Sequence, residues 1–162
     1  MAAPQPDAPP APLQLDHYLP YLINRAGVSL AARFSAALRE AGISLQDWRV
    51  LAALRERDGQ RLTELAQRTS IEVSTLSRLV GGLETNGLVN RSRDSDDARA
   101  IAIRLTAKGE QTTAALTPAA RQLESVALAG LSDAEIAQLK SLLERIYGNL
   151  SALSPHDAPA AK

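Results

Sequence analysis

Apolar side chains recur every three or four positions over most of this chain, which is the spacing that lines one face of an α-helix. The pattern predicts helices over about 16–41, 44–57, 64–68, 72–86, 107–129 and 132–150. Between residues 88 and 105 the period changes from helical to alternating. Residues 88–92 and 100–105 therefore predict the two strands of a β-hairpin, with the polar residues 93–99 at its tip.

Residues with strong end preferences mark the expected helix boundaries. The expected N-caps are Asp16, Ser44, Thr63, Thr106 and Ser132. Ser44 and Ser132 are each followed three residues later by an acidic residue, which is the pattern of a capping box. Pro118 predicts a kink in the long helix that begins at residue 107.

The composition is that of one mostly helical domain. The 162 residues fall within the usual size of a single domain, and 45% of them are hydrophobic, which is enough for a packed core. Because aromatic residues make up only 3%, leucine and alanine must fill that core. Prolines crowd both ends, so we expect residues 1–13 and 154–162 to be disordered tails.

The side chains needed for most catalysis and for metal binding are scarce. The chain has no cysteine, which excludes disulfides and thiolate chemistry. With only His17 and His156, and no glycine-rich phosphate loop, no nucleophile with a base and an orienting group can be assembled. The tip carboxylates Asp94, Asp96 and Asp97 lack the glycine and the bidentate glutamate of a calcium loop. We therefore expect no enzyme, no cofactor and no metal.

Membrane insertion and secretion are also disfavoured. No uncharged stretch approaches the roughly 18 apolar residues that cross a bilayer. The first residues, MAAPQP, show neither the basic start nor the apolar run of a secretion signal. A cytoplasmic protein is therefore expected.

Net charge says nothing about partners, because 18 basic residues balance 18 acidic ones. Arginine supplies most of the basic residues, and its planar fork suits phosphates and guanine edges better than lysine does. A GC-rich genome would produce the same bias, so the arginines alone decide nothing.

The order helix, tight turn, helix and β-hairpin over residues 64–105 is that of a winged helix-turn-helix. The stretch 73–80, VSTLSRLV, resembles the recognition helix of the MarR family of bacterial transcriptional regulators. Residues 97–99 and 101–109, DAR and IAIRLTAKG, are similar to that family's wing and to its exit into the next helix.

Further matches at 46–51 and 130–132 extend the resemblance to about residues 15–153. The resemblance implies a sequence-specific DNA-binding regulator that forms an obligate homodimer. The implied fold class is mainly α, with a β-hairpin wing. The implied regions are a winged helix-turn-helix at 44–106 and a helical dimerisation region at 14–43 and 107–153. The alternative is a protein-interaction module that has kept the winged helix without binding DNA.

The face of the predicted helix 72–86 opposite its apolar stripe carries Ser74, Thr75, Ser77 and Arg78. Short donors let a helix sit deep in the major groove, while an arginine reaches a guanine edge or a phosphate. The competing interpretation is a serine- and threonine-rich helix start with an exposed arginine.

In the hairpin, Arg91, Arg93 and Arg99 are candidate DNA contacts, and we expect Arg99 to enter a narrow A/T-rich minor groove. Asp97 is interpreted as an internal strut that holds an arginine and shapes the tip. The alternative is a solvated loop of mixed charge. Residues 60–108 carry eight basic and six acidic side chains, a net of about +2, so affinity must come from placed contacts and dimer avidity.

Gly81-Gly82 departs from the family pattern, in which a charged residue usually follows Leu-Val. Each glycine costs a helix on the order of 1 kcal/mol relative to alanine. The pair either permits close approach to the DNA backbone or is merely tolerated. Glu72 is expected to act on the helix N-terminal dipole, and Glu84 to pair with arginines of the wing base.

The resemblance also implies an effector pocket between the dimer helices and the winged helix, often taking small aromatic acids. His17, Tyr21 and Arg25 lie on one side of the first predicted helix, where Trp48 and Arg49 could face them. An aromatic wall with cationic and hydrogen-bonding groups suits a planar carboxylate. Alternatively, Trp48 is core and the charged groups are solvated. The sequence thus predicts a repressor that a small aromatic carboxylate releases from a pseudo-palindromic operator.

Overall fold

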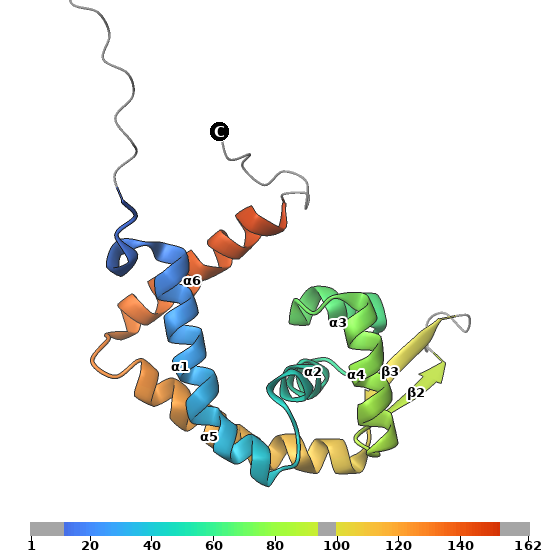
Figure 1. Ribbon diagram of the computed structural model, residues 1–162. Helices are drawn as coiled ribbons and strands as arrows, with labels where there is room; N and C mark the ends of the chain where they lie inside the picture. Colours follow the sequence, from blue (N-terminus) through green and yellow to red (C-terminus); the bar gives the residue numbers. More distant parts are fainter. Residues whose placement is uncertain (1–11, 94–99, 153–162) are drawn as a thin grey trace, which may run out of the picture. The chain divides into compact units, whose positions relative to one another are not determined.

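The structure is a computed structural model that describes residues 12–93 and 100–152 (Figure 1). Its elements are the 3₁₀ turn η1 (Leu15–His17), α1 (Leu19–Glu40), α2 (Leu45–Glu56), β1 (Gln60–Arg61), α3 (Leu62–Thr69), α4 (Val73–Thr85), β2 (Val89–Arg93), β3 (Ile101–Leu105), α5 (Ala107–Ala127) and α6 (Asp133–Ser151). This confirms the predicted class, a mainly helical protein with a β-hairpin. The described residues form two compact units, one up to Leu123 and one from Glu124 onward.

Local capping explains where several helices begin. The Ser44 hydroxyl accepts the Asp47 backbone N–H at 3.1 Å, and the Asp47 carboxylate accepts the Ser44 N–H at 2.9 Å, so the predicted capping box of α2 is present. The same reciprocal pair forms at Ser132 and α6. Thr106 caps α5 as predicted, because its hydroxyl oxygen accepts the Gly109 N–H at 3.1 Å.

Two expected N-caps are wrong. Asp16 lies inside η1, and Tyr18 is the N-cap of α1, with Pro20 in the first turn. Thr63 lies one position inside α3, which begins at Leu62 with Arg61 as N-cap. The cap of α3 is displaced because strand β1 ends directly before this helix. Arg61 pairs with Ala102 in the sheet, which sets an extended backbone directly before the helix.

The sheet has three antiparallel strands in the order β1-β3-β2. The hairpin β2–β3 runs in register from Val89 opposite Leu105 to Arg93 opposite Ile101, as the alternation predicts. Strand β1, which adds Gln60 opposite Ile103, was not predicted. The hairpin tip, residues 94–99, lies outside the described residues.

The main hydrophobic core of the first unit joins α2, α3, α4 and the sheet. Its fully buried members include Leu51, Leu54, Leu65, Leu76, Val80, Leu83 and Ile103. A second cluster joins Phe34 and Leu38 of α1 to Leu116 of α5, with Trp48 of α2 packed against it. The Phe34 and Trp48 rings meet edge to face at 5.4 Å. The helix-turn-helix is therefore built around α2, which contributes to both clusters.

Exposed large apolar side chains gather mainly on two helices. In the first unit they lie on the N-terminal part of α1, at Leu19, Tyr21, Leu22, Ile23, Val28 and Leu30. In the second unit they lie on α6, at Leu139, Leu142, Leu143, Tyr147 and Leu150, and α6 has no buried residue. None of the described helices combines the length and apolar character needed to span a membrane.

Candidate nucleic-acid interface and effector site

The start of α4 is held by a carboxylate. Glu72 is the N-cap, and its side chain accepts the Thr75 backbone N–H at 3.0 Å and the hydroxyl of Ser74. Hydrogen bonds from the Ser74 hydroxyl and from the backbone N–H groups of Ser74 and Thr75 lower the pKa of Glu72 to about 2. Glu72 is therefore an anion at the positive end of the α4 dipole, as the sequence predicts.

The two faces of α4 differ sharply. Leu76, Val80 and Leu83 are buried in the core, while Ser74, Ser77 and Arg78 are exposed and Thr75 is half-buried. The four candidate DNA contacts thus lie on the outer side of the helix. Since the Ser74 hydroxyl donates to Glu72, Ser74 offers a ligand its oxygen as an acceptor and not its proton.

Arg78 lines a shallow groove of about 410 Å³ on this outer side. Its other walls are Thr75, Leu79 and Gly82 of α4, the C-cap residue Asn86, and Asp47 at the start of α2. A Cβ placed on Gly81 or Gly82 would meet no atom within 4 Å, so neither glycine is required by packing inside this chain.

The hairpin root is braced against α4. Arg91 of β2 forms an ion pair with Glu84 at 2.7 Å, which confirms the pairing expected for Glu84. The Arg91 guanidinium is thereby held at the α4 surface, whereas Arg93 at the end of β2 is exposed. Arg99 and Asp97 lie outside the described residues.

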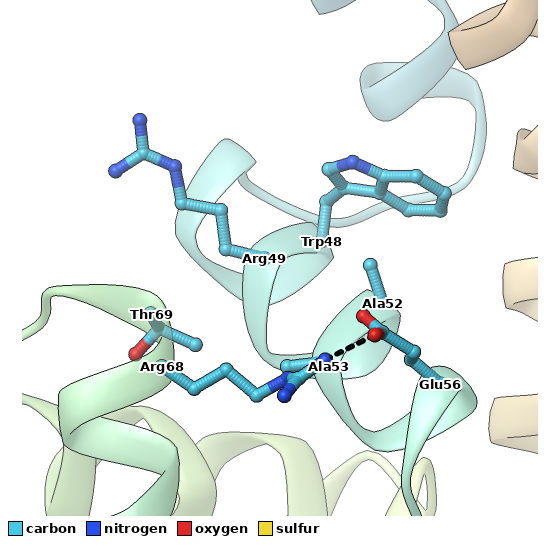
Figure 2. A pocket seen from close by; sticks show the side chains of 7 residues that line it. All are labelled: Trp48, Arg49, Ala52, Ala53, Glu56, Arg68 and Thr69. Carbon is cyan, nitrogen blue, oxygen red and sulfur yellow. Dashed lines mark ion pairs between the residues drawn. The ribbon is translucent and has the colours of Figure 1, made fainter. Parts of the chain in front are cut away.

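The expected effector residues fall into two groups. Trp48 and Arg49 line an open cavity of about 450 Å³ between α2 and α3, together with Ala52, Ala53, Glu56, Arg68 and Thr69 (Figure 2). Within it Arg68 pairs with Glu56, and this guanidinium lowers the pKa of the Glu56 carboxyl. Figure 2 shows the Trp48 ring and the Arg49 side chain leaving α2 in different directions.

His17, Tyr21 and Arg25 do not reach this cavity within one chain. His17 lies in η1 and the other two in the first turns of α1, where Arg25 approaches Asp16 at 4.0 Å. Trp48 contacts Phe34, which follows Tyr21 by more than three turns of one continuous helix, roughly 20 Å along its axis. Spacing predicted that the three residues share a side of the first helix, whereas His17 lies before α1, and it could not give the distance of any of them from α2. Glu56 and Arg68 were missed, because an ion pair between helices leaves no local sequence signature.

Comparison with known proteins identifies the family. The MarR family model matches residues 43–101. The crystal structure of the MarR family transcriptional regulator SPO1453 from Silicibacter pomeroyi is 31% identical, covers 86% of this chain and 99% of its own, and superposes with a TM-score of 0.71. The chain belongs to the MarR family.

Two further relatives bear on its role. The transcriptional repressor IacR of Pseudomonas putida is 27% identical over 116 residues, which are 72% of this chain and 70% of that protein. NadR, solved in complex with 4-hydroxyphenylacetate, is 27% identical, covers 83% of this chain and 96% of its own, and gives a TM-score of 0.74. This MarR family chain is therefore a DNA-binding transcriptional regulator and not an enzyme.

Proposed function

We propose that this MarR family regulator is a homodimeric repressor that binds a pseudo-palindromic operator and is released by a small aromatic carboxylate. The outer face of α4 carries the DNA half of the proposal. Short polar side chains at Thr75 and Ser77 leave room for the helix in the major groove, and the exposed Arg78 is long enough to reach a guanine edge. Arg93, and Arg99 beyond the described residues, would contact the flanking backbone or minor groove.

The dimer is supported by the exposed apolar side chains of α1 and of α6. Residues such as Leu22 and Ile23 on α1, and Leu142 and Leu143 on α6, are each about two-fifths exposed. Exposed large apolar side chains gathered along a helix in this way usually mark an interface. In the proposal, residues 14–43 and 107–153 form the dimerisation region and residues 44–106 the DNA-binding region. The two copies of α4 would then enter successive major grooves about 34 Å apart.

The effector half rests on the cavity between α2 and α3. Trp48 lines this cavity with an aromatic ring, and Arg49 forms no ion pair with any of residues 12–93 and 100–152. An aromatic ring and a guanidinium on the same cavity suit a planar acid. The 4-hydroxyphenylacetate held by NadR is a ligand of that class. Because of the length of α1, His17, Tyr21 and Arg25 would join the site only from a second copy of the chain.

Release requires the acid to bind one state of the dimer better than the other. The cavity is suited to this, since α2 lines one wall and α3, the first helix of the helix-turn-helix, lines the other. A typical coupling of about 1–3 kcal/mol would weaken operator binding roughly 5- to 150-fold.

The DNA half is tested with a duplex that the wild-type protein selects from a random library. Arg78→Ala should relax the base preference and cost about 1–3 kcal/mol of binding, because one bidentate base contact is lost. The control is Arg39→Ala, which replaces an exposed arginine of α1 and should bind the duplex as the wild-type protein does. If the library yields no preferred sequence at low salt and in the absence of any aromatic carboxylate, the chain is not an operator-binding repressor.

The effector half is tested by calorimetry with a panel of hydroxybenzoates, hydroxycinnamates and hydroxynicotinates. Arg49→Ala should lose the heat of binding, and His17→Ala should weaken it. Arg39→Ala again serves as the control. Unchanged binding by both site variants, or a silent panel, would show that no aromatic acid binds where we propose.

A further inference from the structure

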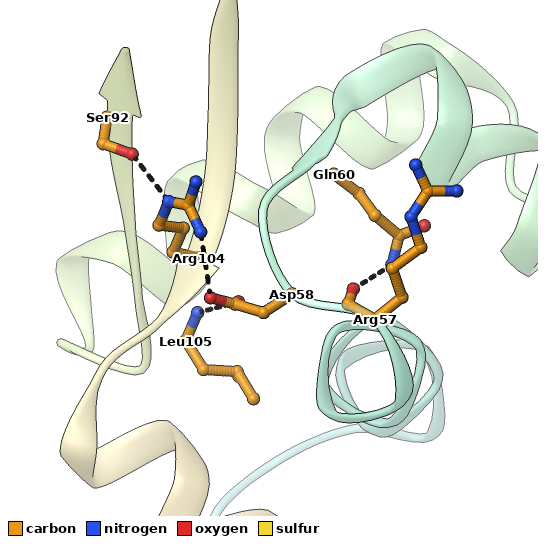
Figure 3. A network of polar contacts seen from close by, with 6 residues as sticks. All are labelled: Arg57, Asp58, Gln60, Ser92, Arg104 and Leu105. Carbon is orange, nitrogen blue, oxygen red and sulfur yellow. Dashed lines mark hydrogen bonds and ion pairs between the residues drawn. The ribbon is translucent and has the colours of Figure 1, made fainter. Parts of the chain in front are cut away.

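One guanidinium joins the turn after α2 to both strands of the hairpin, reaching from near the hairpin root toward the end of β2 (Figure 3). Arg104 of β3 donates from Nε to the Ser92 hydroxyl of β2 at 3.2 Å and from Nη1 to Asp58 Oδ2 at 3.4 Å. The other carboxylate oxygen of Asp58 accepts the backbone N–H of Leu105 at 2.9 Å. We call Asp58, Ser92 and Arg104 the wing clasp.

The turn between α2 and β1 is shaped to receive this guanidinium. Gly59 has φ +70°, and a Cβ there would lie 2.6 Å from Nη1 of Arg104. The guanidinium therefore lies directly over the glycine, so no larger residue fits without moving it. Two independent requirements, a left-handed backbone and a close approach, meet at this one position.

The turn itself is fixed to α2. The buried Gln60 donates from Nε2 to the Ala53 carbonyl at 2.9 Å and to the Arg57 carbonyl at 2.5 Å. It also pairs with Ile103 in the sheet. The wing clasp therefore connects the hairpin to a part of the chain that cannot easily move relative to the helical body.

We propose that Arg104 is a positioning residue for DNA binding. Together with the β1–β3 pairing and the Arg91–Glu84 ion pair, it sets the angle at which β2–β3 leaves the helical body. It therefore holds Arg93 where the wing meets the flanking DNA. This inference rests on the proposed operator binding. The five residues of β2 span about 16 Å, so a rotation of about 10° at the root moves the far end by about 3 Å. A displacement of that size breaks a hydrogen bond to a phosphate.

The clasp is suited to positioning more than to stability. The Arg104 and Asp58 side chains are 37% and 46% exposed, and exposed ion pairs contribute little to folding. We therefore expect Arg104→Ala to remain a folded protein with an unfolding midpoint near that of wild type. Asp58→Asn is the milder variant, because an amide oxygen still accepts the Leu105 N–H while the charge facing Arg104 is lost.

The experiment compares two duplexes, the library-selected operator with its flanks and the same operator trimmed by about half a helical turn at each end. Arg104→Ala should bind the flanked duplex about tenfold more weakly and the trimmed duplex as wild type does, since only the wing contact is lost. Asp58→Asn should show the same selectivity with a smaller loss. Arg55→Ala is the matched control, because Arg55 also links two elements by one hydrogen bond, to the Glu110 carbonyl at 3.3 Å, and should be neutral on both duplexes.

A double-mutant cycle completes the test. If Arg104 acts through Arg93, adding Arg104→Ala to Arg93→Ala should cost nothing further on the flanked duplex. Equal losses on both duplexes, or additive losses in the cycle, would overturn the positioning role. So would an Arg104→Ala protein that binds the flanked duplex as wild type while Arg93→Ala does not. Failure of the wild-type protein to select any operator would instead overturn the proposed function.

Discussion

Replacing Gly81 or Gly82 by alanine should make the protein more stable. Both glycines lie inside α4, where glycine has the highest backbone entropy cost of the ordinary residues. A Cβ at either position meets nothing within 4 Å, so the new methyl groups cause no clash in the chain. Any need for these glycines must come from outside the chain.

The size of the effect follows from helix propensity. Each substitution should add about 1 kcal/mol to the free energy of unfolding, and the double variant about 2 kcal/mol. For a chain of this length, each kcal/mol raises the unfolding midpoint by about 2–4 °C. Gly109 provides the contrast. A Cβ there would lie 2.1 Å from the Leu88 carbonyl oxygen, so Gly109→Ala must displace the chain and should cost about 1–3 kcal/mol.

Urea unfolding measures the stability of the two single α4 variants, the double variant and Gly109→Ala. All are compared at one fixed protein concentration, because the unfolding midpoint of a dimer depends on concentration. Gly82 lies one turn after Arg78 in the same groove, so Gly82→Ala should also weaken operator binding while it stabilises the protein. Opposite changes in stability and affinity cannot come from misfolding. If the alanine variants of α4 unfold more easily than wild type, our account of these glycines is wrong.

Two further predictions concern acid stability and assembly. The pKa of Glu72 is lowered to about 2 from an ordinary value of 4.5, so its stabilising effect is complete above pH 4.5 and is lost as the pH falls toward 2. Over that range Glu72→Gln should therefore lose less stability than the wild-type protein, as measured by circular dichroism. If the two proteins lose stability identically as the pH falls, Glu72 does not stabilise the start of α4. The wild-type unfolding midpoint should rise with protein concentration, since folding and dimer formation are linked. A folded monomer at micromolar concentration in sedimentation would contradict this.

The helices and the hairpin could be predicted because their signals are local. The 3–4 spacing of leucines, the capping pairs at Ser44 and Ser132, and the alternation after residue 88 are all readable within a few residues. Strand β1 could not be predicted, since two residues carry no alternation and their partners lie in β3. The same hidden strand displaced the cap of α3 from Thr63 to Arg61.

The candidate site likewise has a part that local sequence patterns predict and a part that they do not. The exposed face of α4 follows from its buried face, so Ser77 and Arg78 could be located from the apolar stripe alone. The ion pair of Glu56 with Arg68, and the clasp around Arg104, join residues that are distant in sequence and have no motif. Helical spacing likewise showed on which side of α1 Tyr21 lies, but it could not show how far Tyr21 is from Trp48.

Trp48 is the only tryptophan of the chain, and it stands half-buried where α1, α2 and α5 meet. Indole fluorescence depends on polarity and on neighbouring groups, so the unlabelled protein contains a single tryptophan fluorophore at a known position. That fluorophore lies beside Arg49 and edge-on to Phe34, while the hairpin and α4 contain none. Spectral changes on adding a ligand or a denaturant will therefore describe the packing around α2, separately from events at the DNA-facing surface.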